Sequence, residues 1–244
     1  MQRALEVMQE LLYDAFDGAR FERRSDLIVL VCPGLPIPQF NGAWVVEDSR
    51  VAVEALAEAV AEVEATGAWP WLQTRSGHDR TRQQALNLGL TQSMRLPGMV
   101  VEPGDLVEPA VEIDIGLVRD GDVDATNQML SISFEAPKEL FDTLCGVLRS
   151  VKEASWYVGR VKDAIVSTAV GVTVDGATGV FNVATPPEHR GRGYGAALTS
   201  RVVRDGFGAG SRFAFLQSSE IGHGVYRRLG FRDVEQYVLL TRPT

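Results

Sequence analysis

Residues 190–196, with the sequence RGRGYGA, constrain the fold more than any other segment of the chain. Three glycines in five positions allow a tight backbone turn and bring bare N–H groups close to a ligand. The segment follows a strand-like stretch. It precedes a helical pattern in which Tyr194, Leu198 and Val202 share one face. We therefore expect a strand, a glycine-rich turn and a helix in this order.

The helix that begins at this turn is a natural site for a diphosphate. A helix N-terminus carries unpaired N–H groups and a partial positive charge, and Arg190 and Arg192 add charged donors. A P-loop is excluded because no Lys-Ser or Lys-Thr follows the glycines. Gly191, Gly193 and Ala196 also fit a Gly-x-Gly-x-x-Ala dinucleotide fingerprint, although two prolines separate them from their strand. A nicotinamide or flavin site is therefore the weaker alternative, beside a plain turn with exposed arginines.

The charge of the chain is unevenly distributed. The net charge of -8 disfavours a broad nucleic-acid surface. From Thr185 onward, however, nine arginines stand against five acids, which leaves +4 there and -12 in the rest of the chain. Either a confined anionic ligand or ion pairs with the acidic part would explain this asymmetry.

Other sequence features limit the class of protein. The longest apolar run, Leu27–Cys32, is strand-sized, and the N-terminus lacks the pattern of a signal peptide. Cys32 and Cys145 are far apart in apolar surroundings, which favours reduced thiols. Three histidines without paired spacing give no support for a metal site. We expect a cytoplasmic protein with no membrane, nucleic-acid or metal partner.

Residues 102–109 (EPGDLVEP) have the composition of a linker, because two prolines and a glycine lie between strand-like stretches. We place a domain boundary there, with domains at residues 1–105 and 106–244. In the second domain the residue patterns predict strands over 111–118, 155–161, 164–174, 178–184, 212–217 and 235–241, and helices over 139–148, 193–205 and 221–229. Gly206, Gly208 and Gly210 are expected to stop the helix that starts at residue 193. This order predicts an α+β, or mixed α/β layered, fold.

The two halves of the chain contain a faint repeat. Residues 71–74 (WLQT), 77–78 (GH) and 88–90 (LGL) correspond in order to residues 215–218 (FLQS), 222–223 (GH) and 229–231 (LGF). This alignment places Ala85 opposite Tyr226, and nothing in the first half matches residues 190–196. We therefore interpret the first half as a degenerate copy of the second, without its glycine-rich loop.

Two of these motifs resemble those of the GCN5-related N-acetyltransferase (GNAT) superfamily. Arg190, Gly193 and Gly195 are similar to its Arg-x-x-Gly-x-Gly/Ala pyrophosphate loop. Ser219, followed at +7 by Tyr226 and then by residues 229–231, is similar to its closing tyrosine helix. The resemblance covers residues 111–244. It implies an acyl-CoA N-acyltransferase fold with a central, mostly antiparallel sheet flanked by helices, in two related domains.

The resemblance also implies roles for individual residues. The strand over 180–184 would separate from its neighbour and pair with the pantetheine arm, with the N–H near Val183 facing the thioester oxygen. Ser219 would contact the cofactor near its thiol, or only cap a helix. Tyr226 would protonate the departing thiolate, or only pack. The residues implied in cofactor binding are Val183, Ala184, Thr185, Arg190, Gly191, Arg192, Gly193, Tyr194, Gly195, Ala196 and Ser219.

Proton transfer from an ordinary tyrosine to a thiolate is uphill by about 2 kcal/mol, so hydrogen bonding or a lowered pKa of Tyr226 is expected. The base for the amine is not identified by the sequence. Glu188, Glu220, His223 and Glu135 are candidates, although each also suits a surface or capping role.

We expect transfer of an acetyl group from acetyl-CoA to a primary amine of a small molecule or peptide. Aminoglycosides, polyamines or a peptide N-terminus would suit the acidic chain. The alternatives are a non-enzymatic acyl-CoA-binding or regulatory module and, third, a structural protein. A homodimer is possible.

Overall fold

The computed structural model describes residues 1–48 and 51–243, and these form two compact units that are not contiguous in sequence. The C-terminal unit consists of Met1–Met8 and Met99–Asp233. The N-terminal unit consists of Gln9–Gly98 and the described residues from Val234 onward. The sequence-based division at residue 105 places the last strand in the second domain, whereas the structure groups most of that strand with the first.

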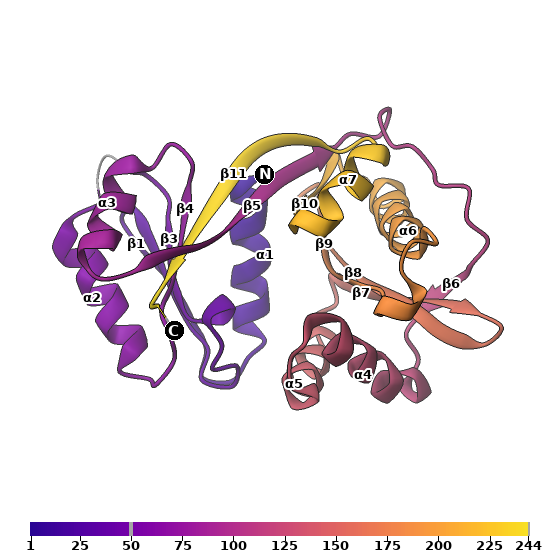
Figure 1. The fold of residues 1–244 in the computed structure, drawn as a ribbon, viewed down its shortest axis with the longest axis horizontal. Coiled ribbons are helices and arrows are strands. Elements are labelled where there is room, and N and C mark those ends of the chain that lie inside the picture. The colour runs from indigo at the N-terminus through magenta and orange to yellow at the C-terminus, as the bar shows by residue number, and fades with distance from the viewer. Residues whose placement is uncertain (49–50, 244) are drawn as a thin grey trace. The chain divides into compact units, whose positions relative to one another are not determined.

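The N-terminal unit is a sheet with helices packed on it (Figure 1). Its strands lie in the order β1-β2-β3-β4-β11-β5, antiparallel from β1 to β3 and between β4 and β11, and parallel between β3 and β4. Helix α2 packs on β2 and β3, and α3 lies beside α2 and β4. The elements of this part of the chain are α1 (Gln2–Asp14), β1 (Arg20–Arg24), β2 (Leu27–Val31), η1 (Pro38–Phe40), β3 (Gly42–Val45), α2 (Val53–Glu64), β4 (Trp71–Arg75), α3 (Asp79–Asn87), β5 (Thr91–Val101) and β11 (Arg232–Thr241).

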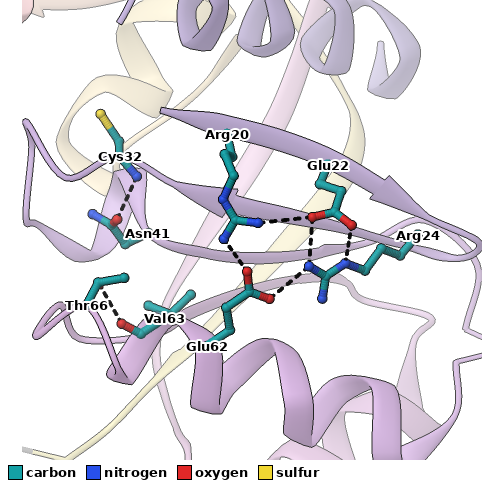
Figure 2. Close-up of polar contacts among 8 residues, drawn as sticks. All are labelled: Arg20, Glu22, Arg24, Cys32, Asn41, Glu62, Val63 and Thr66. Atoms are coloured by element: carbon teal, nitrogen blue, oxygen red, sulfur yellow. Dashed lines mark hydrogen bonds and ion pairs between the residues drawn. The ribbon is translucent and has the colours of Figure 1, made fainter. Parts of the chain in front are cut away.

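Polar contacts join the elements of the N-terminal unit (Figure 2). Arg24 donates to Glu22 from Nε and a terminal nitrogen, both at 2.7 Å, and lies 2.8 Å from Glu62 of α2. Arg20 also pairs with Glu62. These four charged side chains, which are all partly exposed, therefore tie strand β1 to helix α2. Exposed ion pairs of this kind contribute little stability individually.

The C-terminal unit contains the strand order β5-β10-β9-β8-β7-β6. The pairs from β6 to β9 are antiparallel, and β9 and β10 are parallel. Helices α4 and α6 both pack on β8 and β9, and Figure 1 shows them on opposite sides of these strands. Its further elements are β6 (Asp114–Leu117), η2 (Asp120–Asp122), α4 (Val123–Phe134), α5 (Lys138–Leu148), β7 (Ala154–Val161), β8 (Ala164–Val174), β9 (Ala177–Ala184), η3 (Pro187–His189), α6 (Tyr194–Gly208), β10 (Phe213–Gln217) and α7 (Glu220–Arg228).

The prediction that the long helix stops at residue 205 is wrong, because α6 continues through Gly206 to Gly208. Gly206 allows close packing instead of stopping the helix: a Cβ atom there would lie 2.0 Å from Oγ1 of Thr178 in β9. The helix ends at Gly208, and Gly210, just after the C-cap residue Ala209, has a φ of 93°. The N–H of Ser211 then bonds the carbonyl of Gly206 at 3.0 Å, as in a glycine-terminated helix.

Two more elements differ from the sequence-based expectation. The strand predicted over 111–118 is only Asp114–Leu117, and helix α4 was not predicted. Helix α4 buries Thr126 and Asn127 together with Met129 and Leu130, so its inner face lacks a clear apolar period. Among the described residues, no helix is both long enough and apolar enough to cross a bilayer.

The faint sequence repeat corresponds to repeated local structure. In the N-terminal unit, β4, α3 and β5 follow each other as β10, α7 and β11 do later in the chain. Gly89 has a φ of 80° and Gly230 a φ of 93° at the two helix ends. The N–H of Leu90 bonds the carbonyl of Ala85 at 3.0 Å, and that of Phe231 bonds the carbonyl of Tyr226 at 3.0 Å. Ala85 and Tyr226 therefore occupy equivalent positions in their helices.

Asn41 provides a test of the N-terminal unit. Its side chain, in a residue only 1% exposed, accepts from the N–H of Cys32 at 2.9 Å and donates to the carbonyls of Leu35 at 2.7 Å and Ile37 at 2.9 Å. Asn41→Ala leaves these buried groups unpaired, so we expect the free energy of unfolding to fall by about 2–3 kcal/mol. Asn87→Ala, at an exposed residue, is the control and should change it by less than about 0.5 kcal/mol. Equal losses in a denaturant titration would contradict this role.

Candidate functional site

Strand β9 carries an irregularity in the middle of the C-terminal unit. Phe181 pairs with Val170 and Ala184 pairs with Thr168, so β9 has one more residue than β8 between these two pairs. Asn182 takes up the extra residue with a φ of 48°, a left-handed conformation that asparagine tolerates. The second half of β9 is therefore turned relative to the first by a β-bulge.

The other edge of β9 pairs with β10 over a short length. The parallel register joins Ala177–Gly179 to Phe213–Phe215. Residues 180–184 extend beyond this register. Backbone groups of a strand that leaves its partner need another hydrogen-bond partner, such as water or a ligand. This segment is the one that the sequence resemblance assigned to a pantetheine arm.

The loop after β9 leads directly into the N-terminus of α6. Gly191 and Gly193 have φ values of 78° and 79°, and both are exposed. The first hydrogen bond of the helix runs from the N–H of Ala197 to the carbonyl of Gly193 at 3.0 Å. The N–H groups of Tyr194, Gly195 and Ala196 precede it and have no acceptor within the helix. The loop and the first turn of α6 therefore present adjacent N–H donors, as an anion site requires.

Contacts at the glycines show how tightly this loop is held. A Cβ atom on Gly193 would lie 2.6 Å from Cγ2 of Val111, closer than any real contact, whereas one on Gly195 would lie 3.5 Å from Val183 and from Oγ1 of Thr185. The end of β9 and the first turn of α6 are therefore in direct proximity. Of the two positions, only the one at residue 193 requires glycine by both conformation and space.

The two arginines of the loop also contribute to its shape. Nε of Arg190 donates to the carbonyl of Thr185 at 2.9 Å, and Arg192 donates to the carbonyl of Glu188 at 3.4 Å. Both side chains are exposed and keep further N–H donors.

Ion pairs neutralise part of the basic C-terminal stretch. Five of its nine arginines pair with carboxylates, and these are Arg201, Arg204, Arg227, Arg232 and Arg242. Within residues 1–48 and 51–243, neither Arg190 nor Arg192 forms an ion pair. Positive charge therefore remains at the loop itself.

Helix α7 positions Ser219 and Tyr226. Ser219 caps the helix, since its Oγ accepts from the N–H of Gly222 at 3.2 Å. The Tyr226 ring lies edge-on to Phe231, with centroids 5.9 Å apart, and folds back over Gly222, where a Cβ atom would lie 2.8 Å from Cε2 of the ring. Both side chains therefore border Gly222. The N-cap role of Ser219 does not prevent its O–H from donating to a ligand.

The electrostatic surroundings of Tyr226 differ from what the sequence led us to expect. Burial raises the pKa of its phenol to about 12, whereas a lowered pKa or a hydrogen bond was expected. In the described part of the chain, the Tyr226 hydroxyl has no hydrogen-bond partner. The phenol is thus a protonated donor throughout the neutral pH range, and a polar atom of a ligand would find it unengaged.

The candidate bases occupy surface, ion-paired or helix-end positions. Nε2 of His223 lies 2.8 Å from Asp233, which also pairs with Arg227 at 3.0 Å. Glu188 and Glu220 are exposed, and Glu135 ends α4 in a left-handed conformation with a φ of 53°. No group of three or more histidine, cysteine or acidic side chains in the described residues is arranged to hold a metal ion.

The sequence analysis did not single out Ser167, which the structure places at this site. It lies in β8, is fully buried, and contacts both the carbonyl of Ala184 and the hydroxyl of Thr185. Its only sequence signal is that it is a hydroxyl residue within an otherwise mostly apolar strand pattern, a signal too common to indicate a role.

Comparisons with known proteins show which family model and which solved structures this chain resembles. A family model described as an acetyltransferase (GNAT) domain matches residues 114–234. A sequence search of curated proteins finds no match. A solved GCN5-related N-acetyltransferase from Kribbella flavida is 22% identical with a TM-score of 0.75, and the match covers 100% of this chain and 95% of that one. One from Sphaerobacter thermophilus is 20% identical with a TM-score of 0.67, covering 98% and 86%.

A solved structure with two such domains is also similar. It is a tandem GNAT protein from the clavulanic acid biosynthesis pathway, 15% identical with a TM-score of 0.61, and the match covers 98% of this chain and 88% of that one. These structural matches show a shared fold over nearly the whole chain. Together with the family model, they confirm the mixed α/β fold expected from the sequence. Residues 114–234 therefore form a GNAT acetyltransferase domain.

Proposed function

We propose that this protein is an N-acetyltransferase that moves an acetyl group from acetyl-CoA to a primary amine of a small molecule or peptide. The observation that carries the proposal is the juxtaposition of the bulged end of β9 with the glycine-rich N-terminus of α6. This juxtaposition offers a backbone edge for an extended amide chain next to a cluster of N–H donors for a diphosphate. Coenzyme A carries these two groups in sequence, so its chemistry fits the donors that the chain presents.

In this proposal each part of coenzyme A has its own contacts. The diphosphate binds the N–H groups of residues 191–196 and the free N–H donors of Arg190 and Arg192. The pantetheine arm pairs with residues 180–184 of β9, including Val183, Ala184 and the neighbouring Thr185. The thioester then lies toward the bulge at Asn182, and the N–H near Val183 stabilises negative charge on its oxygen.

The reaction is direct attack of the amine on the thioester. The amine nitrogen forms a bond to the acetyl carbon, the C–S bond breaks, and the sulfur departs as a thiolate while the nitrogen loses a proton to water or a base. Tyr226 donates to the departing sulfur. With the pKa of Tyr226 at about 12, full proton transfer to a thiolate of ordinary basicity costs about 5 kcal/mol. Tyr226 therefore stabilises the thiolate by a hydrogen bond before the proton moves, and Ser219 is placed to donate a second one.

The same pKa favours one alternative function. A phenol that gives up its proton reluctantly suits a module that binds acyl-CoA without turnover. Such a module would bind coenzyme A tightly and fail to acetylate any member of a broad amine panel. The enzyme reading predicts acetylation of at least one amine class in that panel.

We also propose that the chain is a tandem protein whose first half is a silent GNAT-like domain. Three features support this: the repeated order of β4, α3 and β5, Ala85 in place of Tyr226, and the lack of a counterpart of residues 190–196. The first half then binds no coenzyme A. That the whole protein lies in the cytoplasm, and that it pairs as a homodimer, stay predictions from the sequence.

Two alanine variants of the loop test the diphosphate site. Gly193→Ala places a methyl group against Val111 and strains a φ of 79°, so we expect coenzyme A binding to weaken by about tenfold or more. Gly195→Ala is the matched control, because its methyl group makes ordinary contacts, and we expect at most a threefold change. Both dissociation constants can be measured by isothermal titration calorimetry. Equal effects of the two variants, or none, would be inconsistent with this site.

Tyr226→Phe tests the proposed role of Tyr226 as the proton donor to the departing thiolate. The variant keeps the ring packing on Phe231 but removes the donor, so kcat should fall by about 10²-fold or more while the KM for acetyl-CoA stays within about threefold. The wild-type rate should show no loss from phenol ionisation below about pH 10, since the pKa of Tyr226 is about 12. Wild-type turnover in the variant would remove Tyr226 from the mechanism.

Binding stoichiometry tests the silent first half. A calorimetric titration of the whole chain should give one coenzyme A per chain, because only the C-terminal unit carries the glycine-rich loop. Gly193→Ala should weaken that single site. A second site that survives in this variant would show that the first half binds the cofactor.

A further inference from the structure

Ser167 of β8 is a fully buried hydroxyl residue at the point where β9 gives way to the glycine-rich loop. Residues on one side of a strand alternate, and Ala169 and Gly171 face α6: Ala169 belongs to the core cluster with Leu198 and Val202, and a Cβ atom on Gly171 would lie 2.7 Å from Val202. The direction along β8 from Gly171 to Ser167 therefore leads toward the N-terminus of α6. Figure 1 shows α6 over these strands.

The hydroxyl of Ser167 connects two consecutive residues at the end of β9. Its Oγ donates to the carbonyl of Ala184 at 2.8 Å and lies 2.9 Å from Oγ1 of Thr185. A serine hydroxyl has only one proton to donate. Because Ser167 donates it to the carbonyl of Ala184, the hydroxyl of Thr185 is the donor in its contact with Ser167. Thr185 is thereby held in one rotamer, with its Oγ1 3.5 Å from the position of a Cβ atom on Gly195.

The carbonyl groups of this segment are engaged by side chains. That of Ala184 accepts from Ser167, and that of Thr185 accepts from Nε of Arg190 at 2.9 Å. An unpaired carbonyl oxygen near a diphosphate would repel it, whereas N–H groups attract it. Ser167 and Arg190 thus each donate a hydrogen bond to one of these two carbonyl oxygens, close to the place where the anion is proposed to bind.

We propose that Ser167 is a positioning residue for coenzyme A: through Ala184 and Thr185 it fixes the junction at which the pantetheine strand turns into the diphosphate loop. This inference rests on the proposed function. It predicts that Ser167 affects the affinity for coenzyme A and has little effect on the chemical step, because it lies one residue layer behind the ligand.

Three variants isolate this role from general destabilisation. Ser167→Ala removes the hydroxyl. Ser211→Ala is the matched control, because Ser211 is also a buried serine bonded to a threonine hydroxyl, at 2.7 Å from Thr178, near the C-terminus of α6. Thr185→Val removes the hydroxyl that Ser167 contacts.

We expect Ser167→Ala to raise the dissociation constant of coenzyme A and the KM for acetyl-CoA about fivefold to tenfold, with kcat within about twofold. Ser211→Ala should lower the melting temperature similarly and leave the affinity unchanged. In the Thr185→Val background, Ser167→Ala should have less than about half its usual effect on the logarithm of the affinity, because the two residues act as a unit.

Two outcomes are informative in different ways. If the wild-type chain binds coenzyme A but Ser167→Ala binds it equally well, or if Ser211→Ala weakens binding as much, the positioning role is wrong and the proposed function stands. If the wild-type chain binds no coenzyme A in the same titration, the proposed function fails, and this inference fails with it.

Discussion

The close packing of helix α6 on strands β8 and β9 is the constraint on which the candidate site depends. Two glycines make it possible, one on each side of the interface: Gly171 in β8 admits Val202, and Gly206 in α6 admits Thr178. A larger side chain at either position would push the helix away from the sheet. Because the helix is held along its length, its N-terminus is fixed beside the end of β9, and its N–H donors face the region where that strand leaves its neighbour.

The strand and the helix contribute complementary halves of one site. The register of β9 with β10 ends at Gly179, so that one edge of residues 180–184 lies beyond it while the other still pairs with β8. The bulge at Asn182 turns this segment, and Gly191 and Gly193 shape the loop that follows. Buried polar contacts then fix the junction between them, from Ser167 to Ala184 and Thr185. In the proposed function, an extended ligand with a diphosphate would meet prearranged donors, so little ordering of the protein would be needed when it binds.

In the proposed function, the chemistry rests on a phenol whose surroundings oppose ionisation. Burial against Phe231 and Gly222 raises the pKa of Tyr226 and leaves its hydroxyl without a protein partner. A donor of this kind is most useful when negative charge develops on a neighbouring sulfur, because the low-polarity environment strengthens the new hydrogen bond. In the N-terminal unit the equivalent helix position is Ala85, which is fully buried and carries no hydroxyl.

The sequence by itself determined the local signals: the glycine loop before α6, the N-cap at Ser219, the Leu-Gly turns after α3 and α7, and hence the family resemblance. These depend on residues close together in the chain, where backbone sterics act directly. Only the tertiary structure decided the bulge at Asn182, the inclusion of Gly206 in α6, the burial around Tyr226 and the contact of Ser167 with Thr185. Each depends on residues brought together by packing. The inclusion of β11 in the N-terminal unit depends on its pairing with β4, in which Val238 pairs with Thr74, 164 residues earlier in the chain. Such pairing has no local sequence signal, because any apolar strand pattern fits several neighbours.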